Sequence, residues 1–491
     1  MYVGIIVKST STKVEILLNR TLELGEFLII KDEKYKNILF KIVGLEYRTE
    51  ALDEIDYSDI YPLLNESAGE YKGNSYLIAD CKPVCIIDES GIRTVKTIPR
   101  LYSKVNTVSE ENMKFLYKNG IFIGKLRNGS DSIDVDVKID SKLFIPHHIL
   151  ISANTGKGKS NLLKVMLWSI IEESNMGVIV MDPHGEYSAS LEKHQLFNDR
   201  VRVYSAQQKN SAETLVINTD TIQPSHFEGI MSFTDAQMDL AYILYKQIGN
   251  EWIRELFNDN NPFIKELINN RQVQPITVKT LQRKMMSQLG LKKNFKGKVF
   301  TNEPGVGENT INNIVKHILN GMSVIIDTSR LYENVEMLIC GIVASNIFVS
   351  QMNSMEDKGI QNLTPVAIVL EEAPKVIGDA TGGENIFKRI AKEGRKFGIG
   401  LIAVTQMAYL IPKEILANMN TKIILGNDSA SERSVIINSA PQDLSQEDRE
   451  IATLEKGEGI ISSSLLSIAI PFKAPLIESF YKNKTEKRIE L

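Results

Sequence analysis

One short stretch, residues 149–171, constrains the fold of this chain more than any other. An apolar run at residues 149–151 leads into the glycine-rich sequence ANTGKGKS at residues 153–160, and an apolar, helix-like segment follows at once. A strand, a glycine-rich turn and a helix in this order are the pattern of a phosphate-binding loop, or P-loop. The sequence therefore predicts an α/β domain in which the start of a helix faces a bound phosphate.

The residue types of this loop suit a nucleoside triphosphate bound with Mg²⁺. Gly156 and Gly158 allow successive backbone N–H groups to turn inward around a phosphate. Lys159 places a charge on the β and γ oxygens, and Ser160 offers a hydroxyl to Mg²⁺. We expect eight consecutive residues to bind ATP: Asn154, Thr155, Gly156, Lys157, Gly158, Lys159, Ser160 and Asn161.

One position departs from the P-loop pattern. The motif G-x-x-x-x-G-K-[ST] begins with glycine, and this chain has Ala153 there. The alternative interpretation of the stretch is a glycine-rich surface turn without a ligand. The strand before the loop and the helix after it favour the P-loop.

The composition is that of a soluble globular protein with more than one domain. Of 491 residues, 43% are hydrophobic and 24% are charged. The net charge of −4 argues against a generally basic nucleic-acid coat but allows local basic surfaces. The N-terminus lacks the pattern of a signal peptide, and the longest largely apolar stretch, residues 398–411, is too short to span a bilayer. We therefore expect a cytoplasmic protein with no membrane attachment.

The cysteines agree with a reducing compartment. The chain has three, Cys81, Cys85 and Cys340, which cannot build a disulfide framework. Cys81 and Cys85 have no histidine or further cysteine nearby. We therefore interpret both as strand residues and not as metal ligands.

The order of patterns along the chain predicts four parts. Short apolar or alternating runs separated by turn residues predict a small β-barrel or sandwich for residues 1–130, ending at a polar joint at 128–131. An ATPase core is expected over residues 131–210 and 309–470, interrupted by a helical insertion at 211–308. Residues 471–491 are expected to form a C-terminal tail.

Within the expected core, strands and helices alternate. Buried-type strands are predicted at residues 176–181, 201–204, 323–327, 366–370, 399–405, 422–425 and 459–462. Such alternation predicts a largely parallel sheet with helices on both faces.

Polar residues at the ends of these strands are candidates for the chemistry. The strand at 366–370 runs directly into Glu371 and Glu372, and neighbouring side chains on a strand point in opposite directions. We assign Glu371 to the water-bridged metal and Glu372 to the base for the attacking water. Gln406, at the end of the next strand, is expected to sense the γ-phosphate.

A second set of polar residues follows the strand at 176–181. Asp182 and Glu186 stand where a nucleotide site gathers polar groups, and a capped, solvated turn is the alternative interpretation. For His184, local capping or hydrogen bonding in the turn is favoured over a role as a ligand. Their roles stay open from the sequence.

Two basic stretches are candidates for contact with nucleic acid. The predicted helix at 384–396 places four basic residues on one face: Lys388, Lys392, Arg395 and Lys396. Six more gather around Phe295: Arg283, Lys284, Lys292, Lys293, Lys296 and Lys298. Either stretch is also consistent with a solvated basic surface.

The ordered motifs resemble one family. The P-loop, Asp182–Tyr187 (DPHGEY), Glu371–Ala373 (EEA), 392–399 (KEGRKFGI) and 401–406 (LIAVTQ) are similar to the HerA family of HerA/FtsK-type translocase ATPases. The resemblance covers about residues 120–465. It implies a RecA-like core and an N-terminal barrel of the HAS type.

The resemblance also implies an activity and partners. It implies an ATP-hydrolysing DNA translocase or helicase, a homohexameric ring with double-stranded DNA in its pore, and Arg395 acting on the ATP of a neighbouring subunit. It further implies a nuclease or NAD-cleaving effector as partner, in DNA-end processing or, for bacterial relatives, in antiviral defence. The alternatives are a secretion or conjugation motor, and a scaffold ring in which ATP only regulates a toxic effector.

Overall fold

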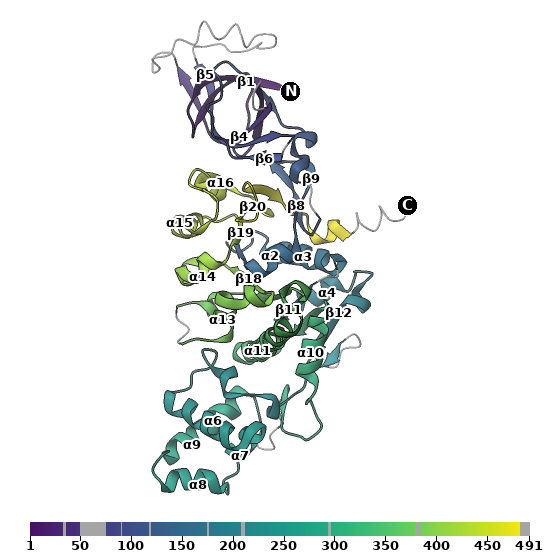
Figure 1. Ribbon diagram of the computed structural model, residues 1–491, viewed down its shortest axis with the longest axis vertical. Helices are drawn as coiled ribbons and strands as arrows, with labels where there is room; N and C mark the ends of the chain where they lie inside the picture. Colours follow the sequence, from purple (N-terminus) through teal and green to yellow (C-terminus); the bar gives the residue numbers. More distant parts are fainter. Residues whose placement is uncertain are drawn as a thin grey trace. The chain divides into compact units, whose positions relative to one another are not determined.

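The computed structural model describes most of the chain (Figure 1). The described residues are 1–32, 36–49, 75–89, 91–116, 119–173, 176–207, 212–292, 296–379 and 383–481. They form two compact units. The first unit comprises Met1–Asp140, Ser152–Val165 and Asn420–Phe480. The second comprises Ser141–Ile151, Met166–Met419 and, within the described residues, Tyr481.

The N-terminal part of the first unit is a closed antiparallel β-barrel, labelled near the N-terminus in Figure 1. Its strands are β1 (Tyr2–Ser9), β2 (Val14–Leu18), β3 (Phe27–Asp32), β4 (Lys36–Thr49), β5 (Ser75–Asp88) and β7 (Lys104–Thr107), with β6 (Gly91–Arg93) added beside β5. The pairing of β2 with β5 closes the circle. Apolar side chains such as Val3, Ile16 and Phe40 fill the interior. The expected small barrel is therefore confirmed.

The rest of the first unit is an antiparallel sheet, which corrects two expectations. Its order is β19 (Thr421–Leu425), β20 (Glu458–Ser463), β21 (Ile470–Lys473), β8 (Ile121–Asn128) and β9 (Asp131–Ile139). β19 and β20 were expected to be parallel, but they pair antiparallel. Residues 471–473 were expected to begin the tail, but they belong to β21, which a short turn joins to β20. Short turns of this kind can only connect antiparallel strands.

The polar stretch at 128–131 is the turn of a hairpin. β8 and β9 pair from Ile121 with Ile139 down to Asn128 with Asp131. Both strands belong to the first unit together with the barrel. The 3₁₀-helix η1 (Glu110–Leu116) lies between barrel and hairpin in the chain.

A buried ionic cluster connects the barrel to helix α16 (Asp448–Thr453). The Lys41 ammonium on β4 lies 2.6 Å from one Glu450 carboxylate oxygen, and Arg127 on β8 pairs with the other. All three side chains are less than 8% exposed. Burial alone would raise the pKa of Glu450, but the two cations outweigh it and lower that pKa. We call these three residues the Glu450 cluster.

The second unit contains a sheet whose paired strands run parallel. Its order is β13 (Glu213–Thr214), β12 (Val201–Ser205), β16 (Ser323–Asp327), β11 (Gly177–Asp182), β17 (Val366–Leu370), β18 (Ile399–Thr405) and β10 (Ile149–Ser152). The pairings of β12, β16, β11, β17 and β18 are parallel. Every residue of β16, β11, β17 and β18 is buried, as in a sheet covered on both faces. The parallel α/β sheet is thus confirmed for this unit.

Helices pack against this sheet. α10 (Thr310–Leu319) contacts β11 and β16, and α13 (Ile386–Glu393) contacts β18. The remaining helical segments around the sheet are α2 (Ser141–Phe144), η2 (Ile145–His147), α3 (Lys159–Glu173), α4 (Glu186–Leu191), α5 (Phe197–Arg200), η6 (Ile360–Asn362), α12 (Pro374–Ile377), η7 (Gly394–Phe397), η8 (Ala408–Leu410) and α14 (Lys413–Asn418); α15 (Ala430–Ser439) precedes α16 in the first unit.

In the second unit, a helical segment is inserted in the chain between the sheet strands β13 and β16. Two short parallel strands, β14 (Ile217–Asn218) and β15 (Phe300–Thr301), pair at its two ends. Between them lie η3 (Thr219–Thr221), η4 (Pro224–Phe227), α6 (Asp235–Ile248), η5 (Gly249–Glu251), α7 (Trp252–Leu256), α8 (Pro262–Asn269) and α9 (Pro275–Gln288). α6 ends at Gly249, whose φ of +78° stops the helix.

Helix α11 (Glu333–Lys358) follows β16 in the chain and has 26 residues. Among the described residues, it is the one helix long and apolar enough to cross a membrane by length and composition. Two thirds of its apolar window is buried inside the protein. Burial of this kind is what a core helix of the α/β unit requires.

Candidate nucleotide site

The P-loop follows β10 and ends in α3, as the sequence predicts. Gly156 and Gly158 have φ values of +82° and +105°, a conformation that favours glycine. The Lys159 ammonium donates to the backbone oxygens of Ala153 at 2.9 Å and Asn154 at 3.1 Å. Ala153 is not among the residues with positive φ, so the departure from glycine there costs no backbone strain.

Two segments of the first unit hold the start of the loop in place. The backbone N–H of Asn154 donates to Gly426 at 3.1 Å, and its side-chain amide donates to Asp428 at 3.1 Å. The Lys157 ammonium donates to the Leu454 carbonyl at 2.9 Å. The Lys157 carbonyl in turn accepts the Gly457 N–H at 3.0 Å. The side chain of Lys157 therefore anchors the loop.

The remaining loop residues differ in what they contact. Thr155, Gly156 and Ser160 are exposed. Asn161, expected to bind nucleotide, uses its side-chain amide on the C-terminal segment: it donates to the Pro475 carbonyl at 2.8 Å and accepts the Ile477 N–H at 2.9 Å. Its side chain thus fixes this segment beside the loop.

In the second unit, Glu371 and Glu372 follow β17 and have different partners. The Tyr187 hydroxyl donates to Glu371, and the Gln406 amide donates to Glu372 at 3.2 Å. Gln406 follows β18, which pairs with β17 in parallel. The two carboxylates therefore contact different neighbours, in a turn that lies beyond the end of β17.

Glu372 has a left-handed backbone. Its φ is +48°, which is rare for a residue with a side chain and costs about 1–3 kcal/mol. Hydrogen bonds on either side hold it there: Ala373 N–H donates to Val404 at 3.0 Å, and Lys375 N–H donates to the Glu372 carbonyl at 2.9 Å. The strained backbone turns the Glu372 side chain away from the direction that a continued β17 strand would give it.

Burial raises the pKa of Glu371 above its ordinary value. The Tyr187 hydrogen bond and the nearby His184 oppose this shift, and the charges of Glu372 and Asp182 add to it. A carboxylate in such surroundings gains from a cation. Carboxylate oxygens such as those of Glu371 are hard ligands of the kind that Mg²⁺ prefers.

Asp182 has a structural role in this arrangement. It is fully buried, and its carboxylate accepts the N–H groups of Glu186 at 2.9 Å and of Tyr187 and Ser188 at 3.1 Å. These bonds hold the start of α4. Tyr187, the partner of Glu371, lies on this helix. Of the residues left open by the sequence, Asp182 is thus a cap, and His184 and Glu186 are exposed.

Arg395 lies on η7, at the end of the expected basic face. Arg395 is exposed. Burial of His147 lowers the pKa of that histidine, and the positive charge of the neighbouring Arg395 lowers it further. No ion pair with a carboxylate is found for Arg395 in the described part of the chain. Lys392, by contrast, pairs with Glu384 at 2.6 Å and Glu414 at 3.6 Å. The face is therefore less positive than the sequence predicts.

Two lysines of the second basic stretch have partners within the chain, one of them an acidic one. Lys284 donates to Ser232 and Gln237 and lies over the Phe233 ring, and Lys296 pairs with Glu303. Lys293 and Phe295 lie outside the described residues.

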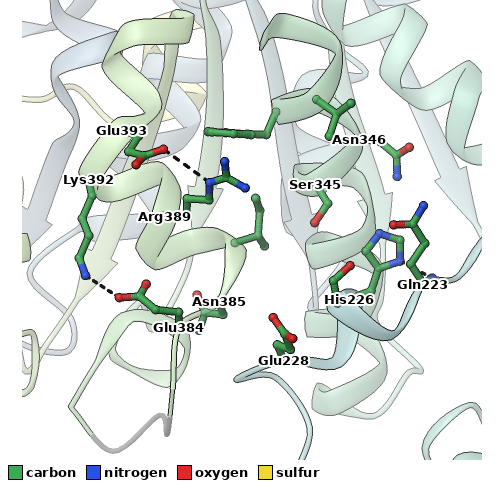
Figure 2. Close-up of a pocket in the computed structure, with 14 residues that line it drawn as sticks. Gln223, His226, Glu228, Ser345, Asn346, Glu384, Asn385, Arg389, Lys392 and Glu393 are labelled. Carbon is green, nitrogen blue, oxygen red and sulfur yellow. Dashed lines mark hydrogen bonds and ion pairs between the residues drawn. The ribbon is translucent and has the colours of Figure 1, made fainter. Parts of the chain in front are cut away.

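A cavity of about 520 Å³ in the second unit was not predicted (Figure 2). It lies among η4, α11 and α13. Figure 2 shows Arg389 paired with Glu393, and Lys392 with Glu384, along one wall. The Arg389 guanidinium also covers the Phe348 ring at 4.5 Å. Both cations along this wall therefore have an acidic partner within the chain.

Sequence reasoning did not identify several residues that position the site: Tyr187 as a partner of Glu371, and Gly426, Asp428, Leu454 and Gly457 around the loop. Tyr187 stood within a quoted motif, but the others follow no motif. Only the tertiary structure brings them to the P-loop.

Comparison with known proteins gives the family. Residues 121–347 match the model of the central domain of helicase HerA. The chain is 24% identical to the DNA double-strand break repair helicase HerA of Pyrococcus furiosus, over 95% of this chain and 91% of that one. It is 26% identical to the helicase of the same name from Sulfurisphaera tokodaii, again over 95% and 91%.

A solved structure shares the fold. The bacterial conjugative coupling protein TrwB superposes with a TM-score of 0.50 at 13% identity, over 75% of this chain and 92% of that one. This likeness concerns the fold alone. Together with the P-loop and the two relatives that span nearly the whole chain, the central-domain match shows that this chain is similar to the HerA family of P-loop ATPases.

Proposed function

We propose that this chain is an ATP-driven translocase or helicase of double-stranded DNA. The two relatives named above are DNA double-strand break repair helicases, and the match to each spans 95% of this chain. In this proposal the barrel is of the HAS type, and the chain assembles into a hexameric ring. The ring powers or scaffolds a partner nuclease or NAD-cleaving effector, in DNA-end processing or antiviral defence.

The observation that carries the hydrolytic part is the backbone of Glu372. Strained residues gather at functional sites, and here the strain presents a carboxylate to Gln406 at the end of the neighbouring strand. A carboxylate positioned in this way can accept a proton from an attacking water. Gln406 is then placed to report on the γ-phosphate.

The other roles follow from the P-loop and its motif order. The loop N–H groups and Lys159 bind the phosphates of ATP, and Ser160 and Glu371 are the residues that would hold Mg²⁺. When bound, Mg²⁺ would place positive charge next to the phosphate oxygens and so stabilise the negative charge on them. Arg395, exposed and without a carboxylate partner in the described residues, stabilises charge on the ATP of a neighbouring subunit.

The test is ATP hydrolysis by the purified chain, with and without double-stranded DNA, across a salt series. We expect DNA to stimulate hydrolysis and the stimulation to fade as salt rises, because contacts with DNA phosphates release counterions. The variant Lys159→Ala is the control for contaminating ATPases. Hydrolysis that is indifferent to DNA at every salt concentration would favour a scaffold ring in which ATP regulates the partner.

A further inference from the structure

A second cavity, of about 530 Å³, opens beside the P-loop within the first unit. It contacts the loop at Gly158 and Asn161, and its other walls include Lys456, Gly457, Pro475 and Leu476. The volume is in the range of cavities that bind small molecules, about 300–1,000 Å³.

The position of the cavity along the loop fixes which end of a nucleotide it faces. In a P-loop the lysine reaches the β and γ phosphates. Here the Lys159 ammonium lies against the carbonyls of Ala153 and Asn154, at the start of the loop. The cavity instead adjoins Gly158 and Asn161, toward the other end. A nucleotide whose β and γ phosphates meet Lys159 has room on this side of the loop for its sugar and base.

The walls of the cavity suit a flat apolar ring next to a phosphate. Leu476 is 57% exposed and presents an apolar side chain, and Pro475 has no backbone N–H to satisfy. Lys456 is exposed beside Gly158, and no ion pair with it is found among the described residues. The other two lysines of the lining are neutralised: Lys125 by Asp134 and Asp136, and Lys473 by Glu458.

The wall is connected to the loop by hydrogen bonds. Ala474 N–H donates to Gly457 at 2.8 Å, and Gly457 N–H donates to Lys157 at 3.0 Å. From the other side, the Asn161 amide holds the backbone at Pro475 and Ile477. The segment is thus fixed in place beside the loop before any ligand arrives.

We propose that this cavity receives the base and ribose of the nucleotide bound at the P-loop, with Leu476 covering the base and Lys456 facing the α-phosphate. The proposal rests on the proposed nucleotide binding and extends it to the residues that distinguish a nucleotide from bare phosphate. Leu476 acts by apolar contact, and Lys456 acts by charge.

The test compares two ligands by calorimetry, Mg·ATP and Mg·tripolyphosphate, which has the phosphates without the nucleoside. Replacing Leu476→Ser should weaken ATP binding by about tenfold or more and leave tripolyphosphate binding unchanged, because only the base contacts this side chain. Lys456→Ala should weaken both ligands, since the charge acts on phosphate. Ile360→Ser, at an apolar residue that is 51% exposed, is the matched control and should change neither.

The outcomes separate this inference from the proposed function. Equal weakening of both ligands by Leu476→Ser, or of neither, overturns the base pocket. Lys159→Ala should abolish binding of both ligands, and if it changes neither, the proposed nucleotide binding itself is wrong. Because Leu476 is exposed, its replacement should keep the melting temperature of the parent, which shows that the variant is folded.

Discussion

Glu372 combines a strained backbone with a side chain in a functional position, and the two can be separated by substitution. Glu372→Gln removes the base and should lower kcat by about 10²–10⁴-fold, with ATP affinity largely unchanged. Glu372→Gly should lose hydrolysis to the same degree. It should also be about 0.5–1 kcal/mol more stable than Glu372→Gln, because glycine adopts the φ of +48° without strain.

The test measures turnover, nucleotide affinity and thermal unfolding for both variants, Glu372→Gln and Glu372→Gly. Loss of ATP binding together with hydrolysis in Glu372→Gln would falsify the role of Glu372 as a base and make it a structural residue. Equal stability of the two variants would show that the left-handed backbone carries little strain.

Asp182 should matter for stability more than for chemistry. Asp182→Ala leaves the buried N–H groups at the start of α4 without an acceptor, and we expect a loss of about 1–3 kcal/mol. Asp182→Asn, which keeps one acceptor oxygen, should lose less. Thermal unfolding measures both. A variant of normal stability that no longer hydrolyses ATP would instead place Asp182 in the chemistry.

The candidate residues were largely readable from the sequence, and their partners were not. The P-loop, the pair Glu371 and Glu372, and Gln406 each follow a strand. The hydrophobic pattern of the sequence locates these strands and therefore places the residues at strand ends. The positive φ of Glu372 has no local signal, since glutamate rarely adopts it. Asn161 and Lys157 resemble ligands in the motif, yet their side chains hold segments more than 290 residues away in sequence.

At the level of elements, strand positions followed from the sequence, but strand direction did not in every case. The buried strands β16, β17 and β18 are separated by helices long enough for parallel crossovers, and they are parallel. β19 and β20 are also separated by helices, α15 and α16, yet they pair antiparallel. β20 continues through a short turn into β21, and β8 joins the sheet from a distant part of the chain.

The Glu450 cluster should stabilise the first unit in a pH-dependent way. Glu450→Gln removes the carboxylate that pairs with both Lys41 and Arg127, and we expect a loss of about 3–5 kcal/mol near neutral pH. Glu447 near Lys41 and Glu23 near Arg127 remain as acidic groups. Because the two cations lower the pKa of Glu450 in the folded protein, its contribution is present above its unfolded pKa, about 4.3. The contribution disappears as the pH falls below that value.

Thermal unfolding of Glu450→Gln and of the parent, from pH 7 to pH 3, checks this expectation. The difference between the two should narrow only at the acidic end. Glu455→Gln, at an exposed residue five positions later, is the control and should follow the parent throughout. A difference that stays constant down to pH 3 would mean that lost packing, and not lost charge, destabilises the variant.

At the level of the whole molecule, the proposed ring makes Arg395 and Lys159 act on the same ATP from different subunits. Arg395→Ala should lower turnover by about 10³–10⁵-fold. Mixing it with Lys159→Ala subunits should restore part of the activity, because some interfaces then carry both intact residues. Lys396→Ala, the neighbouring exposed cation, should keep turnover. Failure of every mixture to recover activity would argue against action between subunits.

The architecture of the chain was predictable where one short motif governs many residues. The P-loop predicted the α/β domain with its parallel sheet. The short apolar or alternating runs of the first 130 residues predicted the barrel. The helical insertion is bounded by β14 and β15, two-residue strands too short to be recognised by any pattern. The division of the chain into units was least accessible, since residues 152–165 and 420–480 join the N-terminal barrel only through tertiary contacts.

Helix α16 has one further consequence. Glu450, within it, is bound to the barrel, and the Leu454 carbonyl just beyond its end is bound to Lys157 of the P-loop. A protein that displaces Lys41 on binding to the barrel would thereby change the free energy of the nucleotide-bound loop. Thermodynamic linkage makes such an effect reciprocal: ATP would alter the affinity of that protein for the barrel by the same factor.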